Sequence, residues 1–337
     1  MKLSLSFKIL LPLLIVLSVS IFSWLEYQRF IITPLAIDEE GYNYQVKAGT
    51  NLSKVSKELS SLKLTNLPPI YLDIFGRLEG RSHLIKTGEF HIKSGTTLPE
   101  LLDQLIAGKV VQHAITLIEG MTIQQVMNII AVHPHITQTL ANSDMATVMA
   151  SLGKPESHAE GWFYPETYHF PTGTTDIEFL KRAHQQMVTA LDRAWQNKAE
   201  KLPYKTPYEA LIMASIIEKE TGIAEERAQI AGVFVRRLQK GMRLQTDPTV
   251  IYGLGDSFDG NLRRKDLKTD TAYNTYTRFG LPPTPIALAS IESLEAALHP
   301  ADGKSLYFVA TGQEGRHVFS SNLRDHNNAV RRYQLKK

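Results

Sequence analysis

The chain has 337 residues, 43% of them hydrophobic and 21% charged, which is the balance of a globular protein and excludes a disordered chain. Its 37 basic and 34 acidic residues leave a net charge of +3 and form no dense basic block, so no nucleic acid is expected as a partner. Cysteine is absent, which excludes disulfides, thiolate metal sites and cysteine nucleophiles.

The first residues predict a membrane anchor. Lys2 and Lys8 precede an uncharged run over residues 9–25, which is close to the shortest helix that spans a bilayer. Basic residues before the run place residues 1–8 in the cytoplasm and the rest of the chain outside. A cleaved signal peptide is the alternative, but bulky residues such as Trp24 stand where a cleavage site needs small ones. In both cases the body of the protein is exported.

The exported part divides into three regions. Residues 26–40 predict a short linker, residues 41–150 a small module with a connecting region, and residues 151–337 a catalytic domain. We therefore expect an α+β protein with an N-terminal transmembrane helix, a small α+β module and a mixed α+β catalytic domain.

Residues 41–150 contain a weak internal repeat. Alternating residues over 42–46 and 88–92 predict strands, and a glycine turn and an amphipathic helix follow each of them. The turns Gly49-Thr-Asn-Leu52 and Gly95-Thr-Thr-Leu98 resemble the Gly-Asp-Thr-Leu turn of the glycan-binding LysM repeat, but they lack its aspartate. The region is therefore predicted as a LysM-like module, with a purely structural αβ platform as the alternative.

Residues 151–337 have the pattern of a second, mixed domain. Helices are predicted over 176–198, 207–221 and 224–239, and a late hairpin over 306–310 and 317–320. A closing helix follows from residue 322 to residue 333.

The helix over residues 207–221 carries the candidate catalytic group. Thr206 suits the N-cap and Gly222 a left-handed end. No charged residue occurs from 211 to 217, so the helix is predicted to be buried on all sides. At 100 degrees per residue Glu218 shares a face with this buried run, whereas Glu220 points about 200 degrees away and is expected to face solvent or an ion pair.

Burial and the negative end of a helix both raise the pKa of a carboxyl group. Glu218 is therefore predicted to stay protonated near neutral pH and to act as a general acid. The alternative is an ordinary helix-end glutamate that pairs with Lys219 or Arg227.

Several long strings follow one another in order along the second half of the chain. They are Glu160-Gly-Trp-Phe-Tyr-Pro-Glu-Thr-Tyr168, Ala214-Ser-Ile-Ile-Glu-Lys-Glu220, Val233-Phe-Val-Arg-Arg-Leu238, Gly241-Met-Arg-Leu-Gln-Thr-Asp-Pro-Thr-Val-Ile-Tyr-Gly253, Tyr273-Asn-Thr-Tyr276, Gly280-Leu-Pro-Pro-Thr-Pro-Ile286, Leu306-Tyr-Phe-Val-Ala310, Phe319-Ser and His326-Asn. Together they resemble the YceG-like family of endolytic murein transglycosylases, called MltG. The resemblance covers residues 155–333 in order and spacing, and the anchor and the LysM-like module match that family's layout. The helix string is intact, and the resemblance places the family's catalytic acid at Glu218.

The resemblance implies cleavage of the β-1,4 bond between N-acetylmuramic acid and N-acetylglucosamine, without water, to leave a 1,6-anhydromuramoyl end. One carboxyl group suffices, because Glu218 can protonate the leaving O4 and then deprotonate the C6 hydroxyl that attacks C1. No metal or cofactor is expected, since the sequence has no HExxH string, P-loop or dinucleotide fingerprint.

Five residues in these strings are predicted to bind substrate. Tyr164 can stack on a sugar ring, and Gln245, Asn274 and Tyr276 can orient acetamido and hydroxyl groups without adding charge. Asp247 is the nearest second carboxylate, although its place before a proline also suits a turn. A place in the core is the alternative for Tyr164, and a role in loop structure is the alternative for the neutral residues.

The resemblance also implies partners and a location. Peptidoglycan glycan strands are the expected substrate, and the expected place is the bacterial inner membrane, crossed once, with the catalytic domain in the periplasm. The protein is expected to end strand elongation beside penicillin-binding protein synthases. Two other functions stay open: a membrane-tethered, non-catalytic glycan-binding scaffold, and a lysozyme-type hydrolase, whose product would have a reducing muramic acid end.

Overall fold

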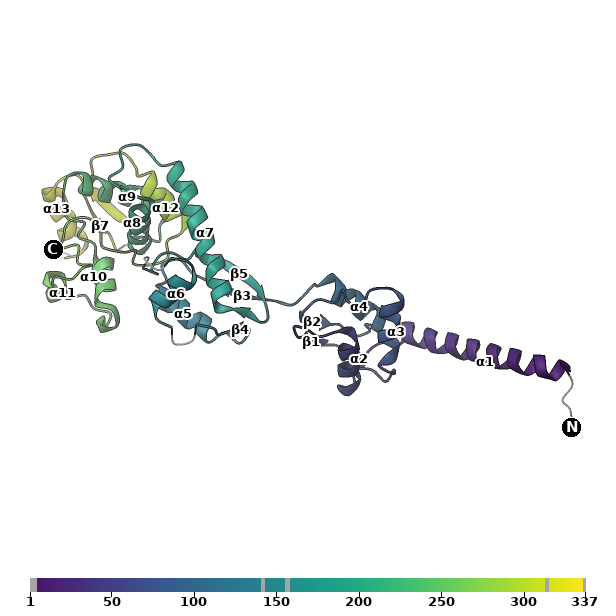
Figure 1. Cartoon of the computed structure of the whole chain (residues 1–337). Coiled ribbons are helices and arrows are strands. Elements are labelled where there is room, and N and C mark those ends of the chain that lie inside the picture. Colours follow the sequence, from purple (N-terminus) through teal and green to yellow (C-terminus); the bar gives the residue numbers. More distant parts are fainter. Residues whose placement is uncertain (1–4, 141–142, 155–157, 313–314, 336–337) are drawn as a thin grey trace. The chain divides into compact units, whose positions relative to one another are not determined.

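The computed structural model describes residues 5–140, 143–154, 158–312 and 315–335, which form two compact units (Figure 1). The first unit runs to His113 and includes Pro171–Gly173, and the second contains Ala114–Phe170 and the chain from Thr174 onward. The division falls earlier than the boundary expected at residue 151. Residues 114–150 belong to the second unit because β3 pairs with β5, a later strand of the sequence.

The first unit begins with the long helix α1 and continues as two strands with helices between and after them. The two strands are antiparallel, with Tyr42 opposite Ile92 and Val46 opposite Gly88, and they coincide with the two predicted strands. The elements are α1 (Leu5–Ile32), β1 (Tyr42–Val46), α2 (Leu52–Ser61), α3 (Ile70–Leu78), β2 (Gly88–Ile92) and α4 (Leu98–Ala107). The likeness to a LysM repeat stays a prediction.

Helix α1 extends beyond the predicted membrane span. Residues 10–32 are long and apolar enough to cross a membrane, the one such helix among the described residues. The expected linker at 26–40 is therefore wrong in its first part, because residues 26–32 continue the helix. The reason is burial: Phe30 and Leu35 are 3% and 4% exposed and belong to the core of the first unit. An apolar side chain in a core fixes the backbone that carries it.

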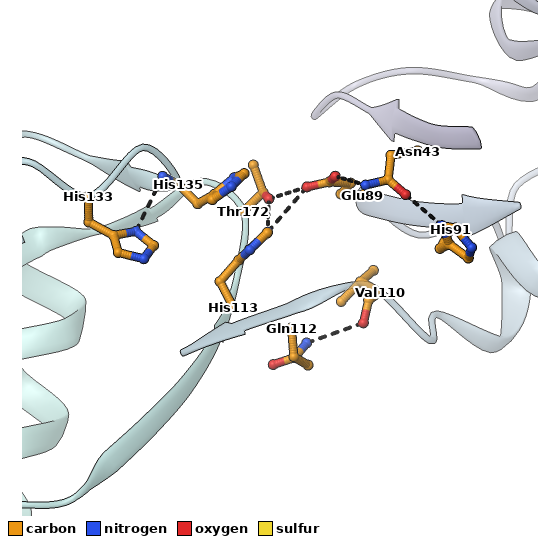
Figure 2. Close-up of polar contacts among 9 residues, drawn as sticks. All are labelled: Asn43, Glu89, His91, Val110, Gln112, His113, His133, His135 and Thr172. Atoms are coloured by element: carbon orange, nitrogen blue, oxygen red, sulfur yellow. Dashed lines mark hydrogen bonds and ion pairs between the residues drawn. The ribbon is translucent and has the colours of Figure 1, made fainter. Parts of the chain in front are cut away.

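A polar network lies at the end of the β1–β2 pair (Figure 2). The Glu89 carboxylate accepts hydrogen bonds from Asn43 Nδ2 at 2.9 Å and from Thr172 Oγ1 at 2.5 Å, and it lies 3.3 Å from His113 Nε2. Asn43 Oδ1 in turn lies 2.7 Å from His91 Nδ1. These bonds join the 171–173 segment to β2 within the first unit.

The second unit is built around the buried helix α8 (Pro207–Glu220), which contacts α7 (Asp176–Gln196), α9 (Ala224–Gln239), α10 (Asp247–Leu254) and α12 (Ile291–Leu298). Every residue of α8 from 210 to 217 is buried, as its uncharged sequence predicts. Thr206 caps the helix by accepting a hydrogen bond from Glu209 N. The helix ends in an extended Thr221, not in a left-handed Gly222 as expected.

The remaining elements of the second unit are short. Strand β3 pairs with β5, β4 pairs with β6 in parallel, and β7 pairs with β8 as the predicted C-terminal hairpin. The α+β class is therefore confirmed. The elements are β3 (Gln112–Thr116), α5 (Ile123–Ala131), β4 (Ile136–Thr137), α6 (Met145–Ser151), β5 (Thr167–Pro171), β6 (Thr174–Thr175), the 3₁₀ turn Gly255–Ser257, α11 (Arg264–Lys268), β7 (Tyr307–Ala310), β8 (His317–Ser320) and α13 (Leu323–Tyr333).

Candidate active site

A pocket of about 500 Å³ lies within the second unit, at the C-terminal end of α8. It joins segments that are far apart in sequence: the end of α8, one residue of α9, the loop before α10, the C-terminal hairpin and α13. Carboxylates, amides, aromatic rings and a buried guanidinium line it, so it combines acid–base groups with surfaces that suit a sugar. The lining residues are Glu220, Arg237, Gln245, Asp247, Tyr276, Tyr307, Phe308, Val309, Ala310, His317, Leu323, His326, Asn327, Val330 and Gln334.

Glu220 is the carboxyl group of this pocket that lies on α8. Its Oε1 accepts a hydrogen bond from Thr246 Oγ1 at 2.5 Å. Burial raises the pKa of Glu220 to about 6, and the charge of Asp247 adds to this effect, whereas the bond from Thr246 and the nearby His317 act in the opposite direction. A carboxyl group with this pKa holds a proton far more often than an exposed one, which is the property required of a general acid.

The loop over residues 245–247 places a second carboxylate in the pocket. Gln245 adopts a left-handed backbone with φ of 51°, which is uncommon for a residue other than glycine. Its N–H donates to Thr275 O at 3.2 Å, which holds the loop in this conformation. Helix α10 then begins at Asp247, whose Oδ1 accepts a hydrogen bond from the Tyr276 hydroxyl at 2.5 Å. Gln245, Asp247 and Tyr276, three of the predicted substrate-binding residues, thus line one pocket.

Asn274, which is predicted to bind substrate, does not line this pocket. It is fully buried, and its Nδ2 donates to three backbone carbonyls, including that of Thr269 at 2.7 Å. Its Oδ1 accepts a hydrogen bond from Tyr276 N at 2.9 Å. Because these bonds occupy the amide, Asn274 supports the loop that carries Tyr276 and does not line the pocket.

Tyr164 lies in another groove of the second unit, of about 490 Å³. Most of the other lining residues belong to α7 and are polar, among them Arg182 and Arg193. The structure therefore does not bring Tyr164 together with the other predicted substrate-binding residues.

Glu218 is also absent from the pocket lining, although it is only two residues from Glu220. Its half-buried carboxylate accepts a hydrogen bond from Ser290 N at 2.9 Å and a second one from the Ser290 hydroxyl. Ser290 is the N-cap of α12, and its Oγ accepts a hydrogen bond from Ser293 N. Glu218 thus joins the end of α8 to the start of α12.

The C-terminal side of the pocket is absent from the sequence-based site. Arg237, which is 7% exposed, donates to Leu306 O at 2.7 Å and to Leu244 O at 2.6 Å, and its guanidinium lies 5.1 Å from the centre of the Tyr307 ring. His326 stacks on the same ring at 5.1 Å. The sequence does carry a signal for this side, because the strings that contain Tyr307 and His326 belong to the family resemblance.

Comparison with known proteins gives a consistent result. Residues 44–332 match the sequence profile of the YceG-like family. The chain is 31% identical over 325 residues to a Bacillus subtilis protein named endolytic murein transglycosylase, a match that covers 91% of this chain and 89% of that protein. A Streptococcus pneumoniae protein of the same name is 26% identical over 341 residues, which cover 90% of this chain and 61% of that protein.

The fold also has a solved counterpart. A crystal structure of a protein from Listeria monocytogenes, described as yceG-like, matches with a TM-score of 0.55 and 28% sequence identity. The match covers 86% of this chain and 99% of that one.

Proposed function

Because this chain belongs to the YceG-like family, we propose that it is an endolytic murein transglycosylase, a lyase of the bacterial cell wall. The proposed reaction cleaves the β-1,4 bond between N-acetylmuramic acid and N-acetylglucosamine inside a glycan strand and leaves a 1,6-anhydromuramoyl end. The observation that carries this proposal is the Glu220 carboxyl group, which has a raised pKa and lines the pocket at the end of α8.

One carboxyl group can perform both proton transfers of this reaction. The protonated acid donates its proton to the leaving O4 as the bond between O4 and C1 breaks, and positive charge develops at C1. The substrate's own acetamido group can stabilise that charge. The carboxylate then takes the proton of the C6 hydroxyl as O6 bonds to C1, so the enzyme returns to its starting state without water being consumed.

The geometry favours Glu220 over Glu218 as this acid. Two donors from Ser290 engage one oxygen of Glu218, Oε2, whereas Glu220 lines the pocket with Gln245, Asp247 and Tyr276. The assignment of Glu218 from the sequence stays a prediction, and matched variants decide between the two residues.

The groups around Glu220 have separable roles in this proposal. Gln245 and Tyr276 can hydrogen-bond to hydroxyl and acetamido groups of the strand. Asp247, held by Tyr276, adds a negative charge that favours both the proton on Glu220 and the cationic C1. Asn274 would act indirectly, because its Oδ1 accepts a hydrogen bond from Tyr276 N and so holds Tyr276 in position.

Hydrolysis of the same bond is the second candidate function. Two carboxyl groups, Glu220 and Asp247, line the pocket, and a hydrolase uses a pair of carboxyl groups as acid and as base or nucleophile. The product separates the two reactions, because hydrolysis leaves a reducing muramic acid end.

The proposal includes a location and partners. Helix α1 would cross the inner membrane once and hold the rest of the chain in the periplasm, where nascent glycan strands emerge. The LysM-like module would bind glycan, and penicillin-binding protein synthases would make the strands that the enzyme ends.

Mass spectrometry of products from purified glycan strands tests the proposal. The full-length protein in detergent should form internal 1,6-anhydromuramoyl ends, Glu220→Gln should form none, and Glu218→Gln should keep this activity. Activity lost in Glu218→Gln but kept in Glu220→Gln would return the role to Glu218. Reducing ends would indicate a hydrolase, and strands bound by the wild type but left intact would indicate a glycan-binding scaffold.

A further inference from the structure

Helix α3 of the first unit exposes a row of large apolar side chains. Ile70, Ile74 and Leu78 are 53%, 48% and 83% exposed, and their spacing of four residues places them along one face of the helix. The other side of α3 packs on the core through Leu72 and Gly76, which are buried. The exposed row is not required by the fold of the first unit, so it needs a separate explanation.

Direct contacts join α3 to α1 just beyond the apolar run. Tyr71 donates its hydroxyl to Glu26 Oε2 at 3.0 Å, and Glu26 is the first charged residue after residues 9–25. The Phe30 ring lies 6.4 Å from the ring of Tyr71 and 5.2 Å from that of Phe75. The first turn of α3 therefore lies beside the position at which α1 would leave a membrane.

The connection between α1 and the first unit has no flexible joint. Helix α1 is continuous from Leu5 to Ile32 and enters the core through Phe30. The chain directly after it is also fixed, because Leu35 N donates to Thr96 O at 2.8 Å and Ala36 N donates to Leu64 O at 2.8 Å. The position of α1 in a bilayer would therefore fix the orientation of the whole first unit against that bilayer.

The dimensions place the first turn of α3 at the depth of the lipid headgroups. The headgroup region is roughly 5 to 8 Å thick on each side of the hydrocarbon core. Residues 9–25 cover about 26 Å at a helix rise of about 1.5 Å per residue, slightly less than the hydrocarbon core of about 30 Å, so Glu26 lies at the boundary between the core and this layer. Tyr71 reaches the Glu26 carboxylate directly, and Ile70 adjoins Tyr71. Trp24 and Tyr27, which are 61% and 46% exposed, suit the same layer.

The charges beside the row suit a lipid surface. Arg29 and Arg77 have exposed side chains, although Glu26 and Asp73 pair with them within the same helices. Each arginine can reach a phosphate group, since long basic side chains extend toward headgroups while their apolar stems stay near lipid.

We propose that Ile70 and Ile74 insert into the headgroup layer of the bilayer that α1 spans, so that α3 is a second membrane contact of the first unit. The occupant of the exposed row is thus lipid and not a protein. The inference rests on the proposed membrane anchor. Its consequence is that the first unit stands at a fixed orientation on the membrane surface and does not swing about the end of α1.

Depth-dependent quenching of a fluorescent label tests this contact. Because the chain has no cysteine, Ile70→Cys, Ile74→Cys and the control Lys57→Cys would each carry one nitrobenzoxadiazole label. The full-length variants would be placed in vesicles of phosphatidylethanolamine and phosphatidylglycerol. Labels at 70 and 74 should show blue-shifted emission, loss of emission with nitroxide-labelled lipid and protection from iodide, whereas the label at 57 should show none of these.

A label at Leu17→Cys separates failure of the contact from failure of the anchor. If nitroxide lipid quenches the label at 17 while those at 70 and 74 behave like the one at 57, α1 spans the bilayer and the second contact is refuted. If the label at 17 is not quenched either, the anchor itself fails. If the labels at 70 and 74 were protected from iodide in native membranes but not in pure lipid vesicles, the occupant would be a protein and the inference would be overturned.

Discussion

Thr246 donates its hydroxyl to Oε1 of Glu220 over 2.5 Å, and this bond joins the last turn of α8 to the loop that begins α10. Thr246 is 2% exposed and has a fixed position, because its N–H donates to Thr275 Oγ1 at 3.1 Å. A donor held in this way favours the ionised form of the carboxyl group and limits the rise in its pKa that burial causes. The proton affinity of the proposed acid therefore depends on a residue of a different segment.

Replacement of Thr246 by valine should raise the pKa of Glu220 above about 6, because the donor to the carboxylate is lost while the volume is kept. The acid must be protonated to act, so activity falls as pH rises through its pKa. The variant should therefore keep activity to higher pH than the wild type. The rate of anhydromuramoyl formation over a pH series measures this, and an unchanged alkaline limb would contradict the assignment of Glu220.

Asp247→Asn should have the opposite effect on the same profile. Removal of the negative charge lowers the pKa of Glu220, while the asparagine oxygen can still accept the Tyr276 hydroxyl. The alkaline limb should move to lower pH, and a pKa lower by one would reduce the rate above it about tenfold. Asp259→Asn, at an exposed position outside the pocket lining, is the matched control and should leave the profile unchanged. Reducing ends that the wild type forms and Asp247→Asn does not form would favour the hydrolase.

Much of the fold follows from local signals in the sequence. Helix α8 is predicted to within one residue, because Thr206 caps it and its uncharged run has to be buried. The hairpin of β7 and β8 is predicted because short apolar runs flank a glycine turn. The extension of α1 past residue 25 is not predictable in this way, since it depends on the burial of Phe30 in a core formed by later residues.

The candidate site shows where such reasoning ends. The spacing of Glu218 and Glu220 shows that their side chains point to different sides of α8. Because α8 is buried on all sides, the sequence does not tell which of the two sides faces a cavity. That depends on where distant segments pack: Ser290 donates to Oε2 of Glu218, whereas Asp247 and Tyr307 line a pocket with Glu220. The sequence predicts Asn274 as a substrate ligand for a similar reason, since its buried bonds to backbone carbonyls have no local sequence signature.

Ser290→Ala should destabilise the second unit without changing the pH profile of activity. The alanine removes the N-cap of α12, which costs about 1 kcal/mol, and one of the two donors to Glu218, for a total of about 1 to 3 kcal/mol. Urea unfolding in a Trp24→Phe background measures this, because Trp162 and Trp195 then both report on the second unit. The exposed Ser321→Ala is the control, and equal midpoints for the two variants would refute the structural role of this contact.

Glu160 is 1% exposed and lies outside the pocket lining. Its oxygens accept hydrogen bonds from Tyr252 Oη and Ile123 N, both at 3.0 Å. Burial nevertheless raises its pKa from the ordinary 4.5 to about 7. Between these two values the unfolded chain releases the proton while the folded chain keeps it, so stability falls as pH rises from 4.5 to about 7.

Glu160→Gln should remove that loss, because an amide stays neutral and can keep both contacts. The expected difference is on the order of 3 kcal/mol, so the variant should become the more stable protein at neutral pH but not below pH 4.5. Glu220, whose raised pKa acts in the same direction, is present in both proteins, so the difference between their urea midpoints isolates Glu160. Parallel midpoint curves for the two proteins across the pH series would show that Glu160 ionises alike in the folded and unfolded chain.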